Sequence, residues 1–199
     1  RFLQEIVEEM SRLSRISPHV NQASGVSVRM SIANYENLIS NAERRAVLLG
    51  ESHAVARVSD LTALIASSRG KLELSLTEET GQEDKLISRL IGEAVKNVFD
   101  ATPNIKPNQF RNVVEHFESG QSLESGDRIA APEFLRRIGT ISGFARQVEQ
   151  LAKQLDPHLA AGPTASDFLV SVAEFLLDGL HCHNRLNKSQ KSGDVSYGR

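Results

Sequence analysis

The spacing of apolar residues is the feature that most constrains the fold of this chain. Over most of its 199 residues, apolar side chains recur at the i, i+3, i+4 spacing that gathers them on one face of an α-helix. The first such segment covers residues 1–14, and a polar stretch at 14–27 ends it. The second covers residues 28–49, and Gly50 is its stop signal. Its expected buried stripe consists of Ile32, Tyr35, Leu38, Ile39, Ala42, Ala46 and Leu49.

The same periodicity predicts further helices along the chain. Ser59 or Asp60 is expected to cap a short helix that runs to about Ser68. Helical spacing returns in residues 86–99, 110–117, 132–155 and 164–184. The Gly- and Ser-rich stretch 118–127 is predicted to be a loop, and the polar last dozen residues are predicted to be frayed. Since no repeat of fixed period occurs, we expect a helical bundle rather than a solenoid.

One segment has the alternation of a strand. Residues 71–76 alternate polar and apolar side chains, the period of two expected for a half-buried strand. An acidic linker that contains glycine, residues 77–84, follows this segment and is the best candidate for a domain boundary. The sequence therefore predicts an all-α fold with one short strand, divided into a domain at 1–76 and a helical domain at 77–199.

Charge and cysteine content narrow the partners and the compartment. With 23 basic and 25 acidic residues, the net charge of −2 gives no electrostatic reason to expect nucleic acid or an anionic membrane. The one cysteine, Cys182, cannot form an internal disulfide and favours a reducing, cytoplasmic environment. No run approaches the ~20 apolar residues of a membrane span. The start at Arg1 rather than Met suggests a fragment, a processed chain or an expressed segment.

The common catalytic motifs are missing from the sequence. There is no G-x-x-x-x-G-K-S/T loop to hold phosphates, because Gly70 and Lys71 are followed by Leu72. No apolar strand ends in the Asp-Glu pair that would hold magnesium. The G-x-S-x-G, H-E-x-x-H and paired C-x-x-C signatures are also missing. We therefore expect no catalytic residues in this chain and no nucleotide hydrolysis by it alone.

Four segments carry a resemblance to a known family. They are Ser17–Arg29, which runs into an amphipathic helix, Asn41–Gly50, Val58–Leu61 and the strand-like Lys71–Leu76. Together they resemble the lid subdomain of AAA+ ATPases of the magnesium-chelatase I subunit and MoxR type, over roughly residues 1–76. In that family a Gly-x-Ser-x-Arg motif opens a helix, and its arginine, called sensor 2, reaches the nucleotide phosphates. The matching residues are Arg29 and, beside it, Gly25 and Ser27.

The resemblance implies activity for a longer parent protein. The Walker A, Walker B, sensor 1 and arginine-finger elements would all lie before Arg1. ATP and Mg²⁺ are thus implied for the full-length protein, as are a ring oligomer, expected to be a hexamer, and a client or adaptor protein. The part after Asp84 is interpreted as a docking extension for a client or a neighbouring subunit.

Alternatives to this interpretation stay open. Arg29 suits a phosphate because its guanidinium is a fixed fork of donors at a helix start, but it could also be a solvated helix-start residue. The whole chain could be a stand-alone helical interaction module without nucleotide binding. A helical DNA-binding regulator is disfavoured, since no basic recognition helix occurs.

One cluster of side chains is a candidate metal site. His181, Cys182 and His183, with Glu174 and Asp178 on the same helix, suggest a metal, but residues two apart on a helix point about 200° apart. We therefore expect no metal site, and a helix-end cluster instead.

Two basic pairs and one polar loop are further candidate contact sites. Arg44–Arg45 and Arg136–Arg137 are interpreted as solvated helix faces, with subunit contacts as the alternative. His19 and Asn21 either shape the loop beside the sensor-like motif or make hydrogen bonds local to it.

Overall fold

The computed structural model describes residues 1–21, 26–72, 82–191 and 193–199, and it is mostly helical with one small sheet. The elements in chain order are α1 (Phe2–Ile16), α2 (Val28–Leu49), η1 (Val58–Thr62), α3 (Ala63–Ser68), α4 (Glu83–Ala101), η2 (Pro107–Phe110), α5 (Arg111–Glu118), β1 (Leu123–Gly126), α6 (Ala131–Ile138), α7 (Phe144–Leu155), α8 (Pro157–Ala161), α9 (Ala165–Cys182), β2 (Asn187–Lys191) and β3 (Asp194–Gly198).

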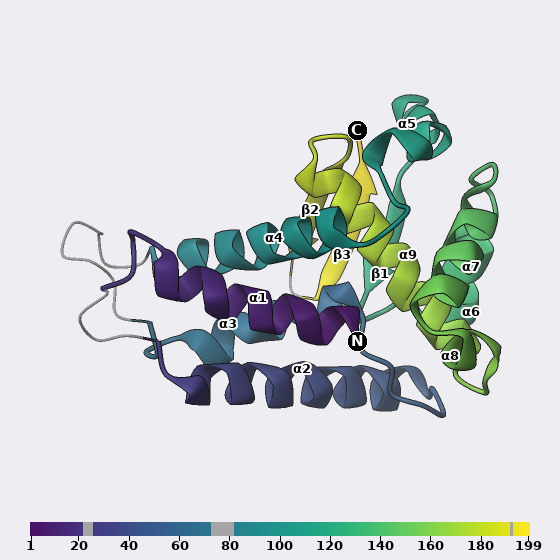
Figure 1. Cartoon of the computed structure of the whole chain (residues 1–199). Coiled ribbons are helices and arrows are strands. Elements are labelled where there is room, and N and C mark those ends of the chain that lie inside the picture. The colour runs from purple at the N-terminus through teal and green to yellow at the C-terminus, as the bar shows by residue number, and fades with distance from the viewer. Residues whose placement is uncertain (22–25, 73–81, 192) are drawn as a thin grey trace.

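The helices form a layered arrangement around α1 and α9. Figure 1 shows α1 between α4 and α2, and both helices contact it. Helix α9 packs against α4, η1, α6 and α7, and α6–α8 form one end of the molecule. Because α1 and α2 are antiparallel neighbours, α2 begins at the end of the molecule away from the N-terminus (Figure 1). Within the described ranges, no helix has both the length and the apolar composition needed to cross a membrane.

One apolar core extends across the predicted domain boundary. Its buried residues range from Phe2 to Tyr197, and the ring centroids of Phe2 and Phe175 lie 4.7 Å apart. Gly179 lets α9 approach α4 closely, because a Cβ at this position would lie 2.0 Å from a ring atom of Phe99. The boundary itself falls mainly on residues outside the described ranges, so the division into two domains stays a prediction. The described parts on both sides of it share this core.

The sheet corrects two predictions. Strands β1, β3 and β2 pair in that order, both pairs antiparallel, where the sequence had predicted a loop and a frayed tail. Val195 and Tyr197 are buried, and the Tyr197 hydroxyl donates to Asp178 Oδ1 on α9 at 3.1 Å. The tail is ordered because these two alternate side chains anchor it against the helix.

The structure describes only the two ends of the predicted strand and linker, residues 71–72 and 82–84. Lys71 and Leu72 form a bend, and residues 73–76, like residues 77–81 of the linker, lie outside the described ranges. The end of the linker is helical, since Glu83 and Asp84 begin α4 instead of preceding it. Acidic residues are favourable in a first helical turn.

Two helix predictions also needed correction. The long helix at 132–155 is interrupted between Ile138 and Phe144, where Gly143 has a φ of 73° and is the N-cap of α7. Only part of the stripe that was expected to be buried on α2 is buried. Its buried face includes Met30, Leu38, Ala42 and Ala46, whereas Ile32, Tyr35 and Ile39 are exposed.

Candidate functional site

The first turn of α2 places Arg29 at the surface. Ser27 is the N-cap, and its Oγ accepts a hydrogen bond from the Arg29 backbone N–H at 3.2 Å. This is the local reason that the helix begins here, because the cap satisfies one of the free N–H groups of the first turn. Met30 is fully buried and holds the turn against the core. Gly25, the first residue of the predicted motif, lies outside the described ranges.

The Arg29 side chain is available for a ligand. It is exposed, and among the described residues its guanidinium makes no hydrogen bond or ion pair. A permanently charged fork of donors beside the N–H groups of a helix start is suited to an anion such as a phosphate. The contact of Arg29 with nucleotide phosphates stays a prediction.

A line of exposed apolar side chains runs along α2 from its N-terminal end, beside Arg29. Val28, Ile32, Tyr35 and Ile39 lie four, three and four residues apart, which places them on one side of the helix. Their exposed fractions are 65%, 54%, 40% and 39%. We call these four residues the α2 stripe. Single exposed apolar residues are ordinary, but a line of four on one helix marks a surface suited to contact with another protein surface.

The other end of α2 is fixed by a buried ion pair. Arg45 contacts both carboxylate oxygens of Asp60, with Nε–Oδ1 and Nη2–Oδ2 distances of 3.2 and 3.1 Å. Arg45 Nη1 also donates to Glu51 at 2.9 Å, and Arg57 donates to the other oxygen of Glu51 at 2.7 Å. The prediction of a solvated Arg45 is therefore wrong. Its neighbour Arg44 does remain half exposed, paired with Asp127.

Asp60 has a second role that differs from the prediction. Its Oδ2 accepts the Arg57 backbone N–H at 2.7 Å, so Asp60 caps η1 from inside its first turn instead of from the position before it. The two segments of the resemblance that contain Arg45 and Asp60 are thus in direct contact.

A buried cluster of charged side chains joins the two halves of the chain. It consists of Arg45, Glu51, Arg57, Asp60 and Glu174. Glu174 on α9 is fully buried and accepts from the Ser59 backbone N–H at 2.7 Å and from the Ser125 hydroxyl. Burial raises the pKa of this carboxyl, and the nearby Arg57 charge opposes the rise only in part. Arg57 also donates to the Ile129 carbonyl oxygen at 2.8 Å. Buried contacts therefore connect α2 with α9 and β1.

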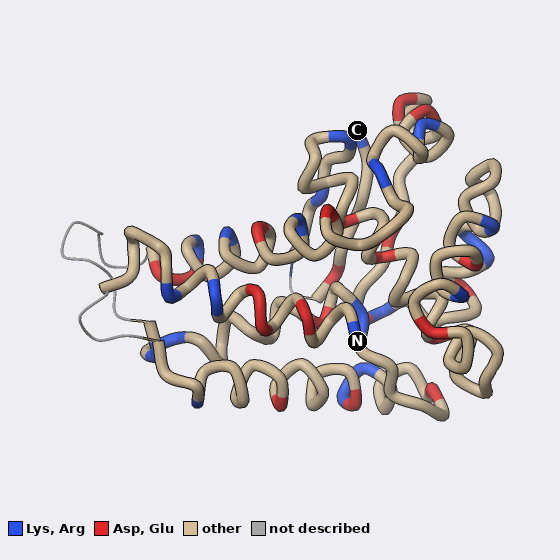
Figure 2. The backbone as a smooth tube through the Cα atoms, viewed as in Figure 1, with Lys and Arg blue, Asp and Glu red and all other residues tan. Residues whose placement is uncertain are grey.

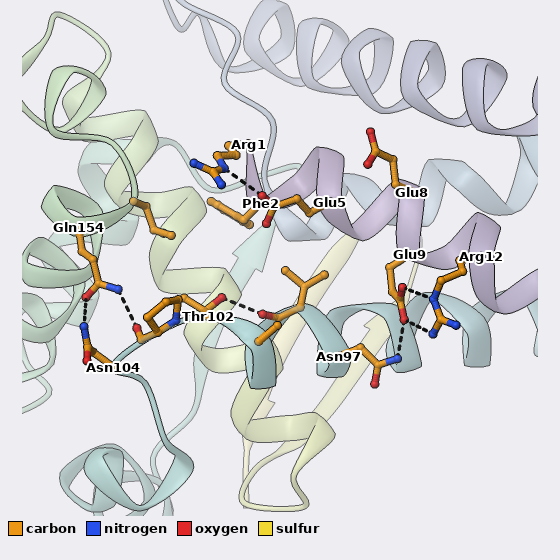
Figure 3. A pocket seen from close by; sticks show the side chains of 14 residues that line it. Arg1, Phe2, Glu5, Glu8, Glu9, Arg12, Asn97, Thr102, Asn104 and Gln154 are labelled. Carbon is orange, nitrogen blue, oxygen red and sulfur yellow. Dashed lines mark hydrogen bonds and ion pairs between the residues drawn. The ribbon is translucent and has the colours of Figure 1, made fainter.

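A large hollow lies at the opposite end from Arg29. It has a volume of about 980 Å³ and lies between α1, α4 and the end of α7 (Figure 3). Glu5 pairs with Arg1, and Glu9 pairs with Arg12 and accepts from Asn97 (Figure 3). The pKa of Glu9 is lowered, chiefly by its hydrogen bond from Arg12. Because its cations are already paired with its own carboxylates, this groove does not favour phosphate.

The histidine cluster at the end of α9 has separate local contacts. His181 Nδ1 lies 3.0 Å from the Leu186 carbonyl oxygen, and His183 Nε2 lies 2.7 Å from Asp100 Oδ1. Glu174 and Asp178 face the interior. In the described part of the chain, no three His, Cys, Asp or Glu residues gather in a way that could hold a metal ion.

In the remaining basic pair, Arg136 is exposed and Arg137 is partly buried. Arg136 and Arg137 both pair with Glu133 on the same helix. Acidic and basic residues are also interspersed along α1 and α4 (Figure 2). These charges form local pairs, and they do not build a basic surface of the kind that binds nucleic acid.

No protein-family model matches the chain. Searches of curated proteins and of solved structures found no match either. A functional interpretation therefore depends on the residues themselves, above all on Arg29, Ser27 and the α2 stripe.

Proposed function

We propose that this chain is the lid and C-terminal extension of a AAA+ ATPase of the magnesium-chelatase I subunit and MoxR type. In this proposal the first turn of α2 faces a nucleotide held by another part of the protein, and Arg29 contacts its phosphates. The chain contributes no catalytic residue and is not active alone. The observation that carries the proposal is the α2 stripe, which lies exposed next to an arginine at a helix start that has no ion pair among the described residues.

The stripe and the arginine support different parts of the proposal. Apolar side chains exposed along one side of α2 support contact with a protein surface, since burial there would stabilise the contact at about 25 cal/mol per Å². Arg29 and the helix N-terminus support an anion at the edge of that contact. ATP with Mg²⁺, when bound by the nucleotide-binding part, supplies that anion.

The buried cluster supports a way to transmit the nucleotide state. Arg45 ties the far end of α2 to Asp60, and Glu174 ties the Asp60 segment to α9. A change in the position of α2 would then move the C-terminal half with it. In the proposed ring, expected to be a hexamer, that half would dock a client or adaptor protein in the cytoplasm.

ATP turnover of the complete gene product tests the role of Arg29. With Arg29→Ala we expect hydrolysis to fall about 10²-fold, the size of effect seen when one donor to a developing charge is removed. Arg111→Ala is the matched control, because Arg111 is an exposed helix-start arginine paired only with Glu115 in the described structure. Unchanged hydrolysis and unchanged nucleotide-dependent assembly in Arg29→Ala would contradict the proposal.

A stand-alone helical interaction module is the second candidate, since the α2 stripe alone would suit it. The two candidates differ in what Ile32→Asp does relative to Arg29→Ala. In a stand-alone module, Ile32→Asp abolishes partner binding and Arg29→Ala has no effect. In the proposed lid, both changes reduce ATP turnover.

A further inference from the structure

Glu174 differs from the other carboxyls of the buried cluster in its partners. Asp60 lies 3.1 Å from Arg45, at ion-pair distance. Glu51 likewise lies 2.7 Å from Arg57. Glu174 is fully buried, but in the described part of the chain it has no ion pair, and its hydrogen-bond partners are uncharged groups of η1 and β1. A buried carboxylate without a paired cation is unfavourable.

The buried cluster holds fewer guanidinium groups than carboxyls. Its two arginines face three carboxyls. The Nη atoms of Arg57 donate to Glu51 and to the Ile129 carbonyl oxygen, and its Nε has no partner among the described residues. With all three carboxyls ionised, the cluster would hold one unbalanced negative charge away from water. A single proton removes that charge.

The elements around Glu174 supply no free cation among the described residues. The buried residues of α4, α6 and α7 are all apolar. On α9, Asp178 is itself paired with Lys188 of β2, and Tyr197 of β3 donates its hydroxyl to the same carboxyl. Asp167, about two turns before Glu174, is a further carboxyl, and it is partly exposed. Burial accordingly raises the pKa of Glu174, and the shared arginine charge opposes the rise only in part.

The hydrogen bonds indicate which oxygen of Glu174 would carry a proton. Oε2 accepts the Ser59 backbone N–H at 2.7 Å, and a backbone N–H can only donate. Oε1 contacts two hydroxyls, that of Ser125 and, at 3.2 Å, that of Ser59. A hydroxyl can accept as well as donate, so a proton on Oε1 can be donated to Ser59 Oγ while Oε1 accepts from Ser125. The neutral acid therefore satisfies all of these contacts.

We propose that Glu174 is a neutral carboxylic acid in the folded protein and that its proton keeps α9 joined to η1 and β1. Its two oxygens hold Ser59 of η1 and Ser125 of β1 against the helix. Loss of the proton would leave an unpaired charge among buried groups, and separation of these elements would admit the water that solvates it. The junction is thus sensitive to pH. This property concerns no nucleotide, so it stands or falls separately from the proposed function.

Infrared spectroscopy of the full chain detects such a proton directly. A protonated carboxyl has a carbonyl stretching band that a carboxylate lacks, and ordinary carboxyls are ionised at about pH 7. We expect this band at that pH, and we expect Glu174→Gln to remove it. Glu149→Gln is the matched control, because Glu149 is exposed on α7, and Asp167→Asn tests the other carboxyl of α9; both should retain the band. If Glu174→Gln does not fold, labelling the glutamate carboxyls with ¹³C shifts the band in the wild type.

Urea unfolding measures the same proton through stability. Because the pKa of Glu174 is raised above 4.5 in the folded state, its contribution is fully present below pH 4.5 and is lost as the pH rises through the folded-state value. Relative to Glu174→Gln at the same pH, the unfolding equilibrium constant of the wild type should rise by up to about tenfold per pH unit in that range. The proposal is overturned if the wild type has no protonated-carboxyl band at about pH 7, if Glu174→Gln retains the band, or if both proteins depend on pH in the same way.

Discussion

Arg45 and Asp60 form an ion pair in which neither side chain is exposed by more than 1%. We expect Arg45→Met to destabilise the fold by about 3–5 kcal/mol, because Asp60 would be left buried without its ion-pair partner and Glu51 would keep only its pair with Arg57. Urea unfolding measures this loss. The neighbouring substitution Arg44→Ala, which removes a half-exposed pair with Asp127, should cost no more than about 1 kcal/mol. Equal losses for the two variants would contradict the described burial.

Glu133 is an acidic group for which we expect a titration well below the ordinary range of glutamate. Hydrogen bonds from Arg136 and then Arg137 lower the pKa of its carboxyl from 4.5 to about 2. Because the pKa in the folded state is depressed, the stabilisation is present above pH 4.5 and is lost as the pH falls toward 2. A ¹³C NMR titration of the carboxyl should show this midpoint. A midpoint near 4.5 in the wild type would show that the arginine contacts do not persist in solution.

At the residue scale the sequence predicted surface chemistry better than buried charge. The exposed position of Arg29 at a helix start, capped by Ser27, could be read from the chain. The burial of Arg45 could not, because its partner Asp60 belongs to another element. One signal was present: Arg45 follows Leu38 by seven residues and Ala42 by three, which places it on the buried side of α2.

Two helix glycines have opposite roles at the scale of elements. Gly179→Ala should destabilise the fold by about 1–3 kcal/mol, because the added Cβ would overlap the Phe99 ring between α9 and α4. Gly92→Ala should instead stabilise it by about 0.5–1 kcal/mol, because alanine favours the helix and meets no neighbour. Thermal or urea unfolding of the two variants measures the sign of each change in stability. The same sign for both would contradict the described packing of α4 and α9.

Long helices were predictable from the sequence, whereas strands β1 and β2 were not. Helices such as α1, α4 and α9 carry long apolar periods, so their positions followed from local pattern. Strands β1 and β2, Leu-Glu-Ser-Gly and Asn-Lys-Ser-Gln-Lys, are too polar and short to stand out, and they form by pairing with β3. Only β3 had a usable signal, the alternate Val195 and Tyr197.

At the scale of the whole molecule, residues 1–72 and residues 82–199 are held together by shared interior contacts. Ser171 on α9 donates to the Ala56 carbonyl at 2.7 Å, and the Ala131 backbone N–H donates to Glu51 at 2.9 Å. The sequence placed a boundary between them from composition alone, and composition does not report such contacts. In the proposed function these contacts carry the position of α2 to the rest of the chain.

The most direct test of the account is whether the α2 stripe is covered in the complete gene product. Hydroxyl-radical footprinting can compare Tyr35 in that protein and in this chain alone, with Leu159 on α8 as an internal control because both residues are 40% exposed. We expect oxidation of Tyr35 to fall in the complete protein and to change with bound nucleotide, while oxidation of Leu159 is independent of nucleotide. Equal oxidation of Tyr35 in the isolated chain and in the complete protein, with and without ATP, would contradict the account.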